Sequence, residues 1–290
     1  MVHINVFGPV CALGEGPLWD PAEQQLYWID SAGKAIYRAA ADGSGLVRWA
    51  APGEVGALAL REQGGAIVTV DRSVYFLDFP SGRFELVADL ERHLPSNRMN
   101  DGKVDRDGRF VFGSFDTEIF AAAEPRAPRA SLYCIEADLR PRKVLGRIGC
   151  SNGPCWSPDG ATFYFSDTAT HAIAAYPWDR ATATVGDPRE FTRPDPLVFP
   201  DGATVDAAGY LWSTACRASE IRRYAPDGTL DRVVRLPIDR PTSVAFGGPS
   251  LDILFVTSMS IRSGGGANAG RVHAVSGLGV TGLAEPRFRG

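Results

Sequence analysis

The segment NGPCWSPDGATFYFSD, residues 152–167, contains the unit from which the fold can be predicted. A short stretch that begins at Asn152 leads into the turn residues Ser, Pro, Asp and Gly, and an aromatic run follows. This order is expected for two β-strands joined by a tight turn. Five other segments align with its beginning. In chain order the six read EGPLWD, VGALAL, NDGKVD, NGPCWS, DGATVD and TSVAFG, and they begin at Glu15, Val55, Asn100, Asn152, Asp201 and Thr242.

These six segments recur about every 40 to 52 residues, a period typical of repeat architectures. Further strand-like runs complete several repeats, such as SLYCIEA at 131–137 and the outer run TLDRVVRL at 229–236. No long segment has the apolar period of about 3.6 residues that marks an amphipathic helix. The sequence therefore predicts an all-β fold: a six-bladed β-propeller with four-stranded antiparallel blades, formed by residues 1–290 as a single domain.

A propeller must close its ring without leaving an open sheet edge. The run HINVFG at 3–8 precedes the first repeat, and we expect it to pair into the last blade. Two longer connections, residues 117–129 and 260–268, break the pattern of tight turns. Loops of this kind often border a site, although plain surface insertions would look the same.

Bulk composition is that of a globular protein, with 44% hydrophobic residues, 22% charged residues and a formal net charge of -4. Scattered Lys and Arg argue against nucleic-acid binding, and no apolar stretch is long enough for a membrane span. The beginning of the chain lacks the features of a secretory signal, so we expect a cytoplasmic protein. A closed propeller needs no partner, and we expect a monomer or a weak homo-oligomer.

The five cysteines contain no C-x-x-C pair, which argues against a zinc knuckle or a disulfide framework. Buried, reduced thiols are expected instead. Because Cys150 and Cys155 are close in sequence, a local disulfide between them stays open.

The aligned residues predict a metal site. Inner strands of a propeller all begin at the same end of the central channel, so Glu15, Asn100, Asn152 and Asp201 are expected to converge there. Two buried, unpaired carboxylates repel each other and cost several kcal/mol unless a cation compensates them. Only hard oxygen ligands are on offer, which suits calcium, magnesium or manganese better than a zinc site built on Cys and His.

Glycine directly follows Glu15, Asn152 and Asp201, and such pairs are common turn formers without any chemical role. The turns themselves fall about five to eight residues later in each repeat, so turn formation does not explain the aligned oxygens. No other chemistry competes, because the four histidines lie in different repeats and phosphate-binding glycine motifs are absent.

Taken together, several motifs resemble the senescence marker protein, gluconolactonase and regucalcin family of six-bladed propellers. The resemblance covers essentially the whole chain, and the motifs are LGEGPLWD at 13–20, NRMNDGKVDRDGRFVFGSF at 97–115, SNGPCWSPDG at 151–160 and PDGATVDAAGYLW at 200–212. Members of this family are metal-dependent lactonases that act on sugar lactones. The resemblance implies one divalent cation, with calcium as the first choice and zinc, manganese, magnesium or ferrous iron as alternatives.

The resemblance also implies roles for individual residues. Glu15, Asn152 and Asp201 would ligate the cation directly, and Asn100 would ligate it more loosely or contact the substrate. The remaining assignments concern the surroundings of the cation. Arg98 would bind the hydroxyls or the carboxylate side of the sugar, Glu118 would hold further hydroxyls, and Asp101 would orient the ligands from behind.

Such a site predicts hydrolysis of a cyclic ester, with the carbonyl polarised by the cation and Asp201 as the general base. We expect an aldonolactone, such as glucono-, xylono-, arabinono- or galactonolactone, to be opened to the aldonic acid in an oxidative sugar degradation pathway. The ring size and chain length of the lactone stay open, as does the physiological ion. Two other functions also stay open: a calcium propeller hydrolase of the paraoxonase or organophosphatase kind, and a non-catalytic metal-binding or interaction propeller.

Overall fold

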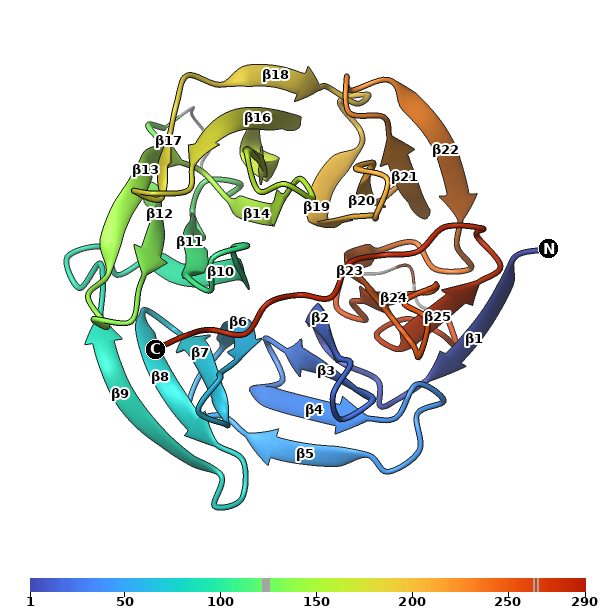
Figure 1. The fold of residues 1–290 in the computed structure, drawn as a ribbon, viewed down its shortest axis with the longest axis horizontal. Helices are drawn as coiled ribbons and strands as arrows, with labels where there is room; N and C mark the ends of the chain where they lie inside the picture. Colours follow the sequence, from blue (N-terminus) through green and yellow to red (C-terminus); the bar gives the residue numbers. More distant parts are fainter. Residues whose placement is uncertain (122–125, 263, 265) are drawn as a thin grey trace.

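Six antiparallel sheets surround a central axis in the computed structural model, which describes residues 1–121, 126–262, 264 and 266–290 (Figure 1). Blade 1 contains β2 (Gly14–Asp20), β3 (Gln25–Asp30), β4 (Ala35–Ala39) and β5 (Val47–Ala50), and blade 2 contains β6 (Val55–Leu60), β7 (Ala66–Val70), β8 (Ser73–Asp78) and β9 (Arg83–Asp89). Blade 3 contains β10 (Asn97–Val104), β11 (Phe110–Asp116), β12 (Ala130–Ile135) and β13 (Arg142–Ile148).

The second half of the ring follows the same order from the axis outward. Blade 4 contains β14 (Ser151–Trp156), β15 (Thr162–Asp167), β16 (Ala172–Asp179), β17 (Thr184–Val185) and β18 (Arg189–Thr192), and blade 5 contains β19 (Phe199–Val205), β20 (Leu211–Cys216), β21 (Glu220–Tyr224) and β22 (Leu230–Arg235). Blade 6 contains β23 (Pro241–Gly247), β24 (Ile253–Ser258), β25 (Val272–Ser276) and, outermost, β1 (His3–Phe7).

The predicted fold class is confirmed. Within the described residues the helical content is a single 3-10 turn, η1 (Thr168–Thr170), and none of it is a helix with the length and apolarity to cross a membrane. Blade 4 departs slightly from four strands, because β17 and β18 share its outer position along β16. Residues 186–188 separate the two pieces, and the proline at the end of this interval has no N–H with which to continue the ladder.

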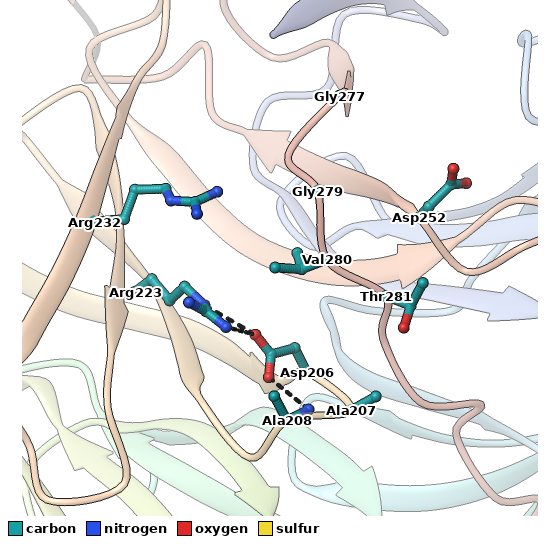
Figure 2. A pocket seen from close by; sticks show the side chains of 10 residues that line it. All are labelled: Asp206, Ala207, Ala208, Arg223, Arg232, Asp252, Gly277, Gly279, Val280 and Thr281. Atoms are coloured by element: carbon teal, nitrogen blue, oxygen red, sulfur yellow. Dashed lines mark hydrogen bonds and ion pairs between the residues drawn. The ribbon is translucent and has the colours of Figure 1, made fainter. Parts of the chain in front are cut away.

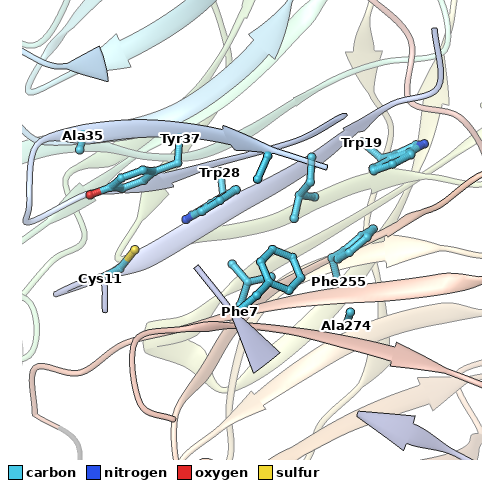
Figure 3. Packing of buried hydrophobic residues seen from close by; sticks show 11 residues of the cluster. Phe7, Cys11, Trp19, Trp28, Ala35, Tyr37, Phe255 and Ala274 are labelled. Carbon is cyan, nitrogen blue, oxygen red and sulfur yellow. The ribbon is translucent and has the colours of Figure 1, made fainter. Parts of the chain in front are cut away.

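The N-terminal strand closes the ring as predicted. It pairs antiparallel with β25, with His3 opposite Ser276 and Phe7 opposite Val272. Phe7 also packs edge-on against Trp28 of blade 1 and Phe255 of blade 6, with both ring centres 6.3 Å away (Figure 3). One strand therefore joins the last blade by hydrogen bonds and links it to the first blade by buried aromatic contacts.

Every inner strand changes register at or directly after its aligned residue, for example between Asn152 and Cys155 in β14 and between Pro200 and Ala203 in β19. This bulge explains the glycines that follow. Gly153 has a φ of 59°, and a Cβ there would lie 2.9 Å from the carbonyl oxygen of Asp201 on the next inner strand. The glycines are thus needed for bulges and for close packing of neighbouring inner strands, and not for turns.

After β25 the chain runs across the end of the channel at which the inner strands finish (Figure 1). Phe288 pairs with Arg61 in a parallel bridge and is fully buried in the cluster formed by blades 2 and 3. Glu285 enters the channel, where its carboxylate lies 3.1 Å from Lys103 Nζ. This segment, which has no strand pattern in the sequence, closes the far end of the channel.

Candidate active site

A pocket with a cavity volume of about 410 Å³ lies at the channel end where the inner strands begin. Four predicted oxygen-bearing residues line it together with Arg98: Glu15, Asn100, Asn152 and Asp201. They come from the inner strands of blades 1, 3, 4 and 5. The structure therefore brings together residues that are up to 186 positions apart in the chain, counted as 201 minus 15.

Two carboxylates meet at the floor of this pocket. Burial, followed by the charges of Asp201 and Asp101, raises the pKa of Glu15 well above its ordinary value, although Arg98 opposes this. Burial and then Asp101 likewise raise the pKa of Asp201. No Lys or Arg in the described part of the chain forms an ion pair with Glu15 or Asp201, since Arg98 pairs instead with Glu54. No cation of the described chain therefore compensates these two carboxylates when they are ionised.

Hydrogen bonds orient the amide of Asn152. The hydroxyl of Thr168 donates its only proton to the carbonyl of Pro200 at 2.7 Å, so it must accept from Asn152 Nδ2 at 2.8 Å. The nitrogen of the amide is therefore held on the Thr168 side, and Oδ1 faces Asn100. The hydrogen bonds therefore assign which end of the Asn152 amide is oxygen and which is nitrogen.

Asn100 is oriented in the same way. Its Nδ2 donates to the carbonyl of Ser151 at 2.8 Å and to Asn152 Oδ1 at 3.0 Å, which uses both of its protons. Asn100 Oδ1 then has no donor in the described chain and is available to a ligand. Met99, the preceding residue, points the other way into the core, as the alternation of a strand requires.

Asp101 lies behind the ring of oxygens, not in the pocket. Its Oδ1 accepts from the backbone N–H of Gly102 at 2.7 Å, and its Oδ2 accepts from that of Gly153 at 2.8 Å. The carboxylate therefore joins the inner strands of blades 3 and 4 beside Asn152. This position suits an orienting role, which stays a prediction.

The two aligned positions without a carboxylate or amide have other tasks. Val55 is fully buried in an apolar cluster. Thr242 is also fully buried, and its hydroxyl donates to the carbonyl of Gly14 and contacts Thr257 Oγ1 at 2.9 Å. Among the described residues, the aligned positions of blades 2 and 6 thus offer no free side-chain oxygen.

Arg98 and Glu118 differ in their relation to the pocket. Arg98 Nε lies 3.3 Å from the Glu54 carboxylate, and its guanidinium carbon lies 5.2 Å from the centre of the Phe115 ring, so the side chain is held against the pocket wall. Glu118 is 56% exposed, forms ion pairs with Arg126 and Arg129, and is not among the lining residues. Substrate binding by Glu118 stays a prediction, and residues 122–125 of its loop lie outside the described residues.

Sequence reasoning missed several residues that line the pocket. These are Leu13, Phe120, Cys150, Thr168, Phe199, Cys216, Arg217, Arg240, Met259 and Arg262. Thr168 ends the motif FYFSDT, and its nearness to Asn152 could have been inferred from the pairing of adjacent strands. Others lie in turns at the same end of the ring, where no repeat frame aligns them.

All five cysteines are free and buried, so Cys150 and Cys155 form no disulfide.

The donors present fit a hard divalent cation. The described residues contain no group of three or more His, Cys, Asp or Glu side chains that could hold a metal ion. The pocket instead combines two uncompensated carboxylates, Glu15 and Asp201, with the amide oxygens of Asn100 and Asn152. Such an all-oxygen set suits calcium, magnesium or manganese and leaves positions for water and substrate.

A second hollow is larger, with a volume of about 910 Å³, but lacks such features (Figure 2). It lies at the other end of β19, where Asp206 follows the strand. Arg223 and Asp206 form an ion pair at 2.7 Å there, so the central charges compensate each other. We therefore assign the chemistry to the smaller pocket.

Comparison with known proteins identifies the family of the chain. The family described as SMP-30/Gluconolactonase/LRE-like region matches residues 13–260. The chain belongs to this family. Two of its relatives are a 6-deoxy-6-sulfogluconolactonase from Pseudomonas putida, 35% identical over 96% of this chain and 95% of the relative, and an L-arabinolactonase from Azospirillum brasilense, 34% identical over 96% and 92%.

A solved structure of a related protein has the same fold. Regucalcin from Agrobacterium tumefaciens, described as a calcium-binding protein, superimposes with a TM-score of 0.87 at 27% identity and covers 97% of this chain and 95% of its own. The resemblance inferred from the motifs is thereby confirmed, and homologues in the family include lactonases, that is, hydrolases of cyclic carboxylic esters.

Proposed function

We propose that this protein hydrolyses a sugar lactone to the aldonic acid with one divalent cation in the pocket. The observation that carries the proposal is the uncompensated pair of carboxylates, Glu15 and Asp201, beside two amide oxygens whose orientation is imposed by hydrogen bonds. Relatives named for lactonases support the choice of substrate class. Glucono-, xylono-, arabinono- and galactonolactone are the candidates, and we place the reaction in oxidative sugar degradation in the cytoplasm.

Glu15, Asn152 and Asp201 would hold the cation, with Asn100 as a weaker ligand or a substrate contact. A divalent cation bound there supplies Lewis-acid polarisation of the lactone carbonyl. Calcium is our first choice because all the donors are hard oxygens and because a relative is described as calcium-binding. Zinc, manganese, magnesium and ferrous iron are the alternatives.

The side chains divide the remaining work. Asp201 accepts the proton of the attacking water as general base, a role that typically contributes about 10² to 10⁴ in rate. Arg98, held against Phe115 and Glu54, donates hydrogen bonds to the substrate hydroxyls. Asp101 keeps Asn152 in place through the N–H of Gly153.

The first test is a lactone panel assayed with each cation, using wild-type protein, Asp201→Ala and Glu15→Gln. The panel contains the four candidates and 6-deoxy-6-sulfogluconolactone. We expect kcat to fall about 100- to 10,000-fold for Asp201→Ala, with a folded protein by circular dichroism. Glu85→Gln, an exposed acid on β9, is the matched control and should retain full activity. Wild-type rates in both site variants would show that the site assignment is wrong.

Chelation tests the cation and separates the alternatives. Removing it leaves the carboxylates of Glu15 and Asp201 uncompensated, so both lactonase activity and the melting temperature should fall, and added calcium should restore them. Unchanged activity and melting would eliminate a functional cation. A shift in melting without activity on any lactone would favour the non-catalytic propeller. A paraoxonase-like hydrolase is disfavoured because the described residues that line the pocket include no histidine.

A further inference from the structure

The rim of the active-site pocket is basic on one side. Arg217 lies in the turn after β20 of blade 5, Arg240 immediately precedes β23 of blade 6, and Arg262 lies in the connection after β24. With Arg98 on the opposite wall, four arginines and two carboxylates line the pocket. The cation of the proposed function already compensates those two carboxylates, so any counter-ion that the arginines need comes from elsewhere.

Protein carboxylates meet this need only in part. Arg98 pairs with Glu54, and Arg240 Nε lies 3.7 Å from the carboxylate of Asp239, which also accepts from the N–H of Gly264. Arg240 Nε is buried and has no hydrogen-bond partner among the described residues. Arg217 and Arg262 form no ion pair within the described part of the chain, and both are exposed.

Aromatic rings hold one of these arginines over the pocket. The guanidinium carbon of Arg217 lies 4.3 Å from the centre of the Phe199 ring. The centre of the Phe120 ring lies 6.5 Å from that of Phe199 and 5.8 Å from that of Phe115. Three aromatic rings therefore form a row across the pocket towards Arg98. Stacking on an aromatic face orders a guanidinium and leaves its N–H groups free to donate in the ring plane.

We infer that the lactone this enzyme takes carries an anionic substituent, bound by Arg217, Arg240 and Arg262 while the ester lies at the carboxylate floor. The inference rests on the proposed function. Guanidinium groups form paired, charge-assisted hydrogen bonds with the oxygens of carboxylate, phosphate or sulfonate, and these bonds are stronger than those to neutral hydroxyls. A neutral sugar would leave the positive charge of the rim uncompensated.

The test compares kcat/KM for neutral and anionic lactones at low ionic strength, with calcium present. The probes are gluconolactone as the neutral lactone, D-glucaric acid 1,4-lactone for a carboxylate, 6-phosphogluconolactone for a phosphate and 6-deoxy-6-sulfogluconolactone for a sulfonate. We expect at least one anionic lactone to exceed gluconolactone by about 10- to 100-fold in kcat/KM, as charge-assisted contacts predict. Added salt should shrink this preference because it screens exposed charges.

The double variant Arg217→Gln/Arg262→Gln should lose most of that preference, chiefly through a higher KM for the anionic lactone, and kcat/KM with gluconolactone should change far less. Arg235→Gln removes the same charge from an arginine that is 88% exposed on the outer strand of blade 5, and it should keep the preference. A wild-type enzyme that prefers gluconolactone, or a double variant that loses all lactones equally, would overturn the inference and leave the proposed function intact. Failure with every lactone would instead refute the proposed function, and the inference with it.

Discussion

Thr168→Val tests whether hydrogen bonding to a buried hydroxyl prepares the cation site. Valine has nearly the shape of threonine, so the substitution removes the hydroxyl and leaves the packing. Thr168 is 7% exposed and connects Asn152 Nδ2 to the carbonyl of Pro200 through contacts of 2.8 and 2.7 Å. Without the hydroxyl, the amide of Asn152 keeps only the hydrogen bond from Asn100 Nδ2 and a weak contact with Cys150, so it turns Nδ2 towards the pocket more easily.

Two magnitudes follow. The variant leaves one buried donor and one buried acceptor unpaired, at about 1–3 kcal/mol each. Asn152 Nδ2 retains only a 3.6 Å contact with Cys150 Sγ, a weak acceptor, so we expect the unfolding free energy to fall by about 2–6 kcal/mol. Loss of a residue that orients a metal ligand typically lowers metal affinity or activity by about 10- to 100-fold, and we expect the same here.

Urea unfolding with and without calcium measures the first effect, and calcium titration with lactone kinetics measures the second. Thr168→Ser keeps the hydroxyl and loses only a methyl group, so it should retain most of the affinity and activity. If Thr168→Val binds calcium and hydrolyses lactone as wild type does, Thr168 does not orient Asn152 and the ligand assignment of Asn152 loses its support.

Two further predictions concern the C-terminal segment. Burial acts to raise the pKa of Glu285, but Lys103 and Arg106 outweigh it and lower the pKa below its ordinary value; the stabilisation is therefore full above the unfolded pKa of about 4.3 and is lost as pH falls through the lower folded value. Urea unfolding should show the stability advantage of wild type over Glu285→Gln disappearing in that acid range, and a pH-independent difference would contradict the reasoning. Phe288→Ala empties a fully buried position and should lower the unfolding free energy by about 3–5 kcal/mol in the same assay, whereas a loss below 1 kcal/mol would show that the segment is not anchored there.

Much of the fold was predictable because its information is local. The alternation of apolar and polar residues in each strand and the turn residues between strands lie within a few positions of one another. Because the sequence repeats, each blade has the same arrangement of strands and turns. Closure by residues 3–8 followed from the need to cover a sheet edge. The interruption between β17 and β18 was not foreseen, because it depends on how residues 186–188 fit against β16.

The candidate site was predictable in one respect. A common repeat frame places Glu15, Asn100, Asn152 and Asp201 at one channel end, and the structure brings all four to the pocket. The explanation of their glycines was incomplete. Gly153 serves a bulge, and its close approach to the Asp201 carbonyl is visible only once two blades lie side by side.

By itself, the sequence determined the number of blades, the strand that closes the ring and the oxygens that converge at its axis, because each of these follows from a short pattern repeated along the chain. Three-dimensional contacts alone settled the orientation of Asn152 by Thr168, the basic rim with Arg217 over Phe199, and the closure of the far end by Glu285, which meets Lys103 across 182 positions. Contacts of this kind join turns and segments outside the repeat frame. Packing across the ring determines which residues meet there, and a local periodic pattern in the sequence does not indicate those pairs.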